Sequence, residues 1–136
     1  MNWVVDTCMI IDVLDNDPSF GAISARLIDE YAPEGLSLCP ISYIELAPAF
    51  LGDKRRQNEF LSAIGIDYNE VLDQRFIEDA YRAWDRQVIL KRSKQAARRP
   101  VADILIGAFA LRRKGILTRN PSDFKRVFPK LKVITP

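Results

Sequence analysis

The stretch RRPVADILIGAFALRRKGILTRNPSDF, residues 98–124, largely decides the fold, because it predicts an apolar helix followed by an apolar strand. Pro100 suits the first turn of a helix and Gly115 suits its end. Residues 116–118 are then expected to form a short strand. The helix carries apolar side chains on nearly all of its faces, so it is expected to be buried.

Asp103 lies in the first turn of that helix, in the middle of an apolar run. Burying a carboxylate without a partner is costly, and a nearby helix N-terminus contributes only up to about 1 kcal/mol. Asp103 therefore needs a cation. An ion pair with Arg98 or Arg99 is one possibility, and a bound metal ion is the other.

Strands and helices alternate along the rest of the chain. The other predicted elements are a strand at 3–5, helices at 9–14 and 20–31, a strand at 36–39, a helix from about Ser42 that is disturbed at Pro48, helices capped by Asp53 and Asp73, and a strand at 132–135. This order predicts an α/β fold of three layers (α/β/α) with a central, mostly parallel sheet. We expect one domain over residues 1–136.

The helix after Asp73 carries an apolar stripe that is predicted to face the core. The stripe consists of Phe76, Ile77, Ala80, Tyr81, Trp84 and Val88. Lys91 and Lys94 continue the same line, which makes them candidates to face a bound anion.

The composition narrows the possible chemistry. The 136 residues include no histidine, which removes Ser-His-Asp and Cys-His catalysis and most zinc hydrolase sites. Cys8 and Cys39 are too few for a disulfide framework or a structural zinc site, and we expect both to be small buried residues. No apolar stretch is long enough to cross a bilayer, and we expect a cytoplasmic protein without a membrane partner.

Charge is distributed unevenly. Residues 1–85 carry 6 basic and 16 acidic side chains, whereas residues 86–136 carry 14 basic and 2 acidic ones. A polyanion such as nucleic acid would suit the basic part. Alternatively, the two parts attract each other within one fold.

Several polar residues are expected to meet beyond the carboxyl ends of the strands, where open parallel sheets bind ligands. Asp6 and Asn120 follow strands directly, and Asp123 lies just beyond. Each has a structural alternative: Asp6 or Asn120 as a helix cap, and Asp123 as an acid in a first turn. Glu45 is expected in the first turn of its helix, where Ser42 and Glu45 would form a capping box. If the carboxylates instead cluster around Mg²⁺ or Mn²⁺, they could activate water for phosphodiester hydrolysis without histidine.

The segments VVDT, SYIEL, VADILIGAFAL and ILTRNPSDF, in this order, resemble the PIN domain family, and most closely the VapC-type toxins of prokaryotic toxin–antitoxin pairs. The resemblance implies that Asp6, Glu45 and Asp103 are the first three acids of the active site and the metal ligands. At the fourth position this chain has Asn120 where many members have an acid, with Asp123 nearby, which leaves a second metal in doubt.

The resemblance further implies an endoribonuclease that depends on Mg²⁺ or Mn²⁺ and cuts structured RNA of the tRNA or rRNA class. It also implies a cognate antitoxin and a homodimer. We expect the substrate to contact Thr7, Thr118, Arg119, Lys91, Lys94 and Arg99. The alternatives are a non-catalytic RNA-binding or scaffold PIN-like domain and, less well matched, a phosphorylation-receiver domain.

Overall fold

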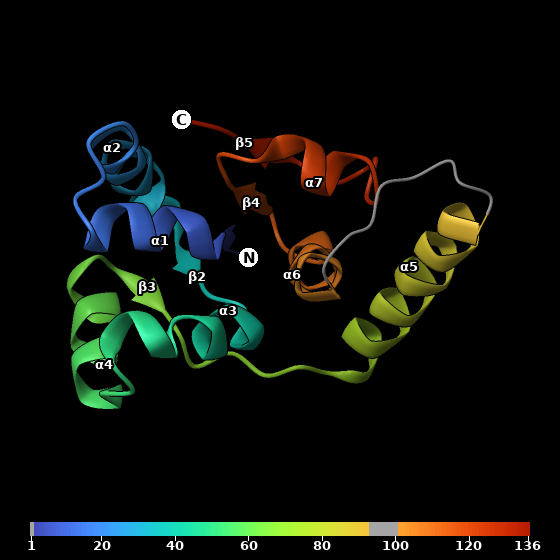
Figure 1. The fold of residues 1–136 in the computed structure, drawn as a ribbon, viewed down its shortest axis with the longest axis horizontal. Coiled ribbons are helices and arrows are strands. Elements are labelled where there is room, and N and C mark those ends of the chain that lie inside the picture. Colours follow the sequence, from blue (N-terminus) through green and yellow to red (C-terminus); the bar gives the residue numbers. More distant parts are fainter. Residues whose placement is uncertain (1, 93–100) are drawn as a thin grey trace.

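The computed structural model describes residues 2–92 and 101–136, and side chains are described up to residue 89 and from residue 101. A five-stranded sheet, with all its pairings parallel, has the order β3-β2-β1-β4-β5. Helices lie on both of its faces (Figure 1). The predicted three-layer α/β/α fold with a parallel sheet is therefore confirmed.

The elements follow the alternation that the sequence predicts, with the addition of the short strand β3, which the sequence analysis did not predict. They are β1 (Trp3–Val5), α1 (Thr7–Leu14), α2 (Gly21–Tyr31), η1 (Ala32–Glu34), β2 (Leu36–Ser37), α3 (Pro40–Glu45), η2 (Ala47–Phe50), α4 (Lys54–Ala63), β3 (Ile66–Asp67), α5 (Gln74–Arg92), α6 (Val101–Leu111), β4 (Gly115–Leu117), α7 (Pro121–Lys125) and β5 (Val133–Ile134). The predicted caps of α4 and α5 are confirmed, because Asp53 accepts from the Arg56 N–H and Asp73 from the Phe76 N–H.

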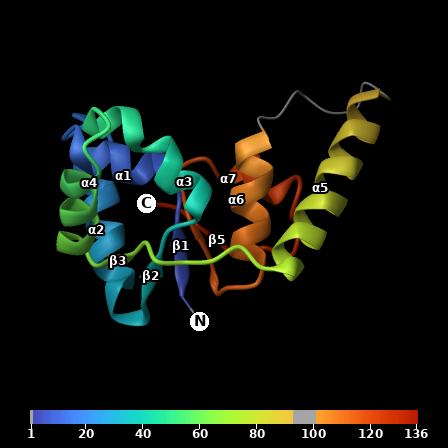
Figure 2. The same ribbon diagram turned by 90° about the horizontal axis from the view of Figure 1, so that it is seen from below.

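The two central strands divide the core between the two faces of the sheet. Val4 and Ile116 point into one hydrophobic cluster, together with residues of α5, α6 and α7. Val5 and Leu117 point into the other, with residues of α1, α2 and α4. This follows from the alternation of side chains along a strand. Figure 2 shows the two helical layers on opposite sides of the strands.

Helix α6 is the buried helix that its sequence predicts. Ile104, Ile106 and Phe109 are each about 1% exposed. At Gly107 a Cβ atom would overlap the ring of Phe128, so the segment after α7 packs directly against this backbone. In both views α5 lies on the outer side of α6, away from the strands (Figure 2).

The predicted apolar stripe of α5 is only partly correct. Phe76 and Ala80 are buried, whereas Ile77, Tyr81 and Trp84 are exposed by 50%, 75% and 42%. Because α5 packs on α6 from outside, its contact line includes the positions Asp79, Ala83 and Gln87, which are buried. An apolar face of α5 is thus left at the surface. No helix in the described part of the chain is both long enough and apolar enough to cross a bilayer.

Candidate active site

Asp6 lies at the carboxyl end of β1, in the middle of the sheet. Its backbone N–H donates to the Leu117 carbonyl (3.0 Å), so the residue after β4, Thr118, lies beside it. One oxygen of the Asp6 carboxylate, Oδ2, accepts hydrogen bonds from Thr118 Oγ1 (2.6 Å) and Cys8 Sγ (3.3 Å). Asp6 occupies the N-cap position of α1 without a capping bond from its side chain, so the cap alternative does not describe it.

Burial disfavours the charged form of this carboxylate. Asp6 is only 6% exposed, and its burial raises the pKa of the carboxyl group above the ordinary value. The hydrogen bonds from Thr118 and Cys8 act in the opposite direction, and the negative charge of Glu45 adds to the increase. A nearby cation would relieve the cost of ionising Asp6.

Cys8 is a hydrogen-bond donor in this arrangement. Burial, reinforced by the charge of Asp6, raises the pKa of the thiol to about 12. The thiol is therefore protonated at neutral pH and is unsuited to act as a nucleophile. Cys39 is buried as expected, but Cys8 is only half-buried and belongs to the site. No local sequence pattern indicates this role.

Glu45 reaches the site from the carboxyl end of α3, and its Oε1 accepts a 2.8 Å hydrogen bond from Thr7 Oγ1. The predicted helix start at Ser42, with Glu45 in the first turn, is wrong. Helix α3 begins at Pro40, whose missing N–H costs nothing at a first helical position. The Ser42 hydroxyl is buried without a hydrogen bond among the described residues, so no capping box forms.

Asp103 lies in the first turn of α6 and is half-buried. Helix α6 is in contact with α3, the helix that carries Glu45. The proposed structural partners, Arg98 and Arg99, lie outside the described residues. The ion pair of Asp103 with Arg98 or Arg99 stays a prediction.

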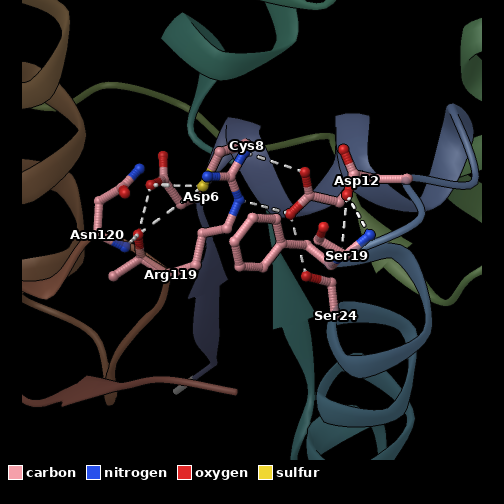
Figure 3. Close-up of polar contacts among 10 residues, drawn as sticks. Asp6, Cys8, Asp12, Ser19, Ser24, Arg119 and Asn120 are labelled. Atoms are coloured by element: carbon pink, nitrogen blue, oxygen red, sulfur yellow. Dashed lines mark hydrogen bonds and ion pairs between the residues drawn. The ribbon is translucent and has the colours of Figure 1, made fainter.

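Asn120 and Asp123 stand at the start of α7. The backbone N–H of Asn120 donates to Thr118 Oγ1 (3.0 Å), and the N–H of Asp123 donates to the Asn120 carbonyl (3.2 Å). The side chain of Asn120 makes no capping bond. In Figure 3 it lies close to Asp6. Thr118 thus links the Asp6 carboxylate to the loop that carries Asn120, and the half-buried Asp123 follows one turn later.

A metal ion bound by the protein alone would need several donor side chains close together. No group of three or more His, Cys, Asp or Glu side chains in residues 2–89 and 101–136 meets this requirement. Asp6 and Glu45 nevertheless present hard oxygen donors on neighbouring elements. The charge of Glu45 raises the pKa of Asp6, and Thr7, the residue after Asp6, donates a hydrogen bond to Glu45. Mg²⁺ is commonly bound by one or two carboxylates while it keeps several waters. Asp6 and Glu45 are ligands of the kind that such a hydrated ion takes. The expected ligand set of Asp6, Glu45 and Asp103 stays a prediction.

Next to this site lies an ion pair that the sequence analysis missed. Asp12 of α1 is 2% exposed and accepts two bonds from Arg119, at 2.7 and 3.1 Å, and one from Ser24 at 3.1 Å. The Arg119 guanidinium also lies 4.5 Å from the centre of the Phe20 ring. Figure 3 shows Arg119 extended towards Asp12. The sequence pattern that would predict this pair is present, since Asp12 lies in an apolar helical run just as Asp103 does.

Other basic residues of the C-terminal part are also paired internally. Arg112 binds Asp79 (2.8 Å), Arg113 binds Glu70 (3.5 Å) and Lys114 binds Glu34 (3.3 Å). Together with Arg119, these cations join the basic part to the acidic part, as the internal-attraction alternative predicts. The guanidinium of Arg119 binds Asp12 and is 30% exposed, and Thr118 is fully buried. The contacts of these two residues with a substrate stay predictions. Lys91, Lys94 and Arg99 lie outside the described side chains.

Comparisons with known proteins agree with this fold. The family model of the PIN domain matches residues 3–128, and the chain belongs to the PIN domain family. The fold is shared with a chain in the crystal structure of VapBC2 from Rickettsia felis bound to a DNA fragment from their promoter. The TM-score is 0.68 at 16% identity, over 99% of this chain and 98% of that chain. A search among curated proteins found no similar sequence. PIN domains are generally nucleases, which supports an enzyme of that class.

Proposed function

We propose that the protein is a divalent-metal-dependent endoribonuclease and the toxin of a type II toxin–antitoxin pair. The observation that carries the proposal is the buried Asp6 carboxylate at the carboxyl edge of a parallel sheet, with Glu45 on the neighbouring α3. The PIN family assignment and the fold shared with VapBC2 support it. The substrate would be structured RNA of the tRNA or rRNA class.

In this proposal Asp6 and Glu45 hold Mg²⁺ or Mn²⁺, and Asp103 contributes from α6 directly or through water. Such an ion makes bound water a stronger nucleophile and neutralises phosphate charge. Thr118 and Cys8 keep the Asp6 carboxylate oriented through the oxygen Oδ2. Thr7 orients Glu45 in the same way. Asn120 would orient a water molecule and Asp123 would supply negative charge.

Protein partners belong to the same proposal. The exposed apolar face of α5 includes Ile77, Tyr81 and Trp84, and Val101 of α6 is 50% exposed beside it. A groove of about 290 Å³ lies between the two helices. Exposed apolar surface of this kind is typical of protein–protein contacts. It supports contact with a second copy of the chain or with a cognate antitoxin. The proposal takes residues 1–136 as a single domain of a cytoplasmic protein.

RNA cleavage in the presence and absence of EDTA tests this function. We expect cleavage that requires the metal and that falls by orders of magnitude in Asp6→Asn. The control is Asp29→Asn, which removes the same charge from an exposed position on α2. Cleavage that persists in EDTA, or an Asp6→Asn variant as active as the control, would contradict the proposal.

A non-catalytic RNA-binding or scaffold domain is the second candidate. It is favoured by one observation, namely that the described carboxylates do not assemble a three-ligand metal site. The same assay separates the two candidates. RNA that binds but remains intact with Mg²⁺ and with Mn²⁺ would support the scaffold.

A further inference from the structure

A groove of about 450 Å³ lies where the chain continues beyond the C-terminal end of α7, and its lining shares no residue with the site around Asp6. It lies between this segment, Arg86 of α5 and Leu111 at the end of α6. Its lining residues are Arg86, Leu111, Arg126, Val127, Phe128, Pro129 and Lys130. The volume lies within the range of ligand-binding pockets.

The groove has a basic rim whose charge is largely uncompensated. Arg112, Arg113, Lys114 and Arg119 are each paired with an acid elsewhere. Among the described side chains no ion pair involves Arg126 or Lys130, and both are exposed. The guanidinium of Arg86 donates a hydrogen bond to the Val127 carbonyl (3.3 Å), and this bond holds the positive charge of Arg86 at the same rim. Arg86, Arg126 and Lys130 thus bring three positive charges to one rim, and none of the three forms an ion pair with a described side chain.

The floor of the groove is apolar and held in place. Phe128 packs on the backbone of α6 at Gly107, and its N–H donates to the Phe124 carbonyl (2.8 Å). Leu111 and Pro129 are the exposed part of the apolar lining. Because the floor is fixed by these contacts, a ligand would not have to order it.

We propose that this groove binds a nucleotide of single-stranded RNA outside the cleavage point, and this inference rests on the proposed function. The base would lie against Leu111 and Pro129, and the adjoining phosphates would contact Arg126 and Lys130. Arginine and an apolar surface together suit a nucleotide, which has an anionic backbone and a flat base. An acidic peptide would use only the basic rim. Helix α7 begins directly after Asn120, and the chain that follows it lines this groove, so one RNA strand running along the helix would reach both sites.

The first test measures binding of a fluorescein-labelled short oligouridylate in EDTA, by anisotropy, as a function of salt. We compare Arg126→Ala/Lys130→Ala with Lys54→Ala/Arg56→Ala, which removes the same charge from exposed positions on α4. The groove variant is expected to bind more weakly, with a salt slope smaller by about 0.7 for each phosphate that is no longer bound. Equal affinity and slope in the two variants would overturn the inference.

The second test concerns the base. An abasic oligonucleotide with the same number of phosphates is expected to bind the wild type more weakly than oligouridylate does, and this difference should shrink in Leu111→Ser. If oligoglutamate depends on Arg126 and Lys130 while oligouridylate does not, the groove binds an acidic protein segment and the inference fails. If RNA binding depends on the groove but no metal-dependent cleavage occurs, only the proposed function is contradicted. If cleavage depends on the metal but RNA binding does not depend on the groove, only the inference about the groove is contradicted.

Discussion

The hydroxyl of Thr118 donates a 2.6 Å hydrogen bond to Oδ2 of Asp6, across the central strand pair β1 and β4. The same hydroxyl accepts the backbone N–H of Asn120 (3.0 Å). Its single proton is therefore directed at the carboxylate, while its lone pair fixes the loop before α7. Thr118 is fully buried, so this role positions the site and does not involve contact with solvent.

Thr118→Val should destabilise the fold because it removes this hydrogen bond while preserving the shape of the side chain. A hydrogen bond to a charged group contributes about 1.5–3 kcal/mol, and we expect a loss in that range at neutral pH. Urea unfolding gives the free energy, and Thr135→Val at an exposed position is the control. A variant as stable as that control would show that the bond contributes little.

Replacing Asp6 by asparagine should stabilise the metal-free protein at neutral pH. Burial raises the pKa of Asp6 in the folded state above the ordinary value of 3.8. A raised folded pKa means that the protonated form is favoured by folding, so stability is fully present below 3.8 and is lost as pH rises through the raised value. The asparagine oxygen can still accept from Thr118.

The measurement is thermal unfolding of wild type and Asp6→Asn in EDTA across the acid-to-neutral range. The advantage of the variant should grow as pH rises above 3.8 and should vanish below it. Excess Mg²⁺ should reduce the advantage, because an ion that binds only the folded wild type stabilises it by mass action. A difference that does not change with pH would contradict the raised pKa.

The alternation of strands with helices, the parallel sheet and the location of Asp6 could be predicted because they depend on local patterns. The strand β3 was not predicted, because its two residues are too short a pattern. Short apolar runs define the strands, and Asp6 follows the first of them directly. The exposed face of α5 could not be predicted, because burial there depends on α6 lying between α5 and the sheet. Tyr81 and Trp84 have the same local pattern as a core stripe, yet both are exposed.

Among the polar side chains, too, some features could be predicted from the sequence and others could not. Asp12 and Arg119 are 107 positions apart, and their pairing depends on the parallel register that brings the end of β4 beside α1. A charge count identifies the basic part of the chain but not which cations are used internally. Glu45 lies beside Thr7 at the carboxyl end of its helix, although that helix was predicted to start two residues too late.

Arg119→Met should be strongly destabilising, because it leaves Asp12 buried without its cation. Removing one partner of a buried ion pair costs about 3–5 kcal/mol, and the partial exposure of Arg119 favours the lower end. The control is Arg55→Met, which breaks an exposed pair with Glu59 on α4 and should cost less than about 1 kcal/mol. The double variant Asp12→Asn/Arg119→Met should recover part of the loss. Similar costs for Arg119→Met and Arg55→Met would mean that Asp12 finds another partner.

Asp103→Asn should reduce RNA cleavage without reducing RNA affinity. If Asp103 contributes to a metal site, the variant should bind RNA in EDTA as well as the wild type or better, since one repulsive charge is removed. Single-turnover cleavage with Mg²⁺ should fall by orders of magnitude, and Asp123→Asn should lose less because Asn120 remains. Parallel losses of binding, cleavage and thermal stability in Asp103→Asn would instead indicate the structural ion pair.

Tyr81→Lys should abolish association through the exposed face of α5 without unfolding the protein. Tyr81 is 75% exposed, so a charge there costs the isolated chain little, whereas an apolar interface would have to desolvate it. Sedimentation analysis of the chain alone, and again with a cognate antitoxin, measures the effect. The control is Arg82→Lys, on the neighbouring exposed position. We expect the wild type and the control to associate and Tyr81→Lys to remain monomeric at equal melting temperature. Unchanged association in Tyr81→Lys would place the partner on another surface.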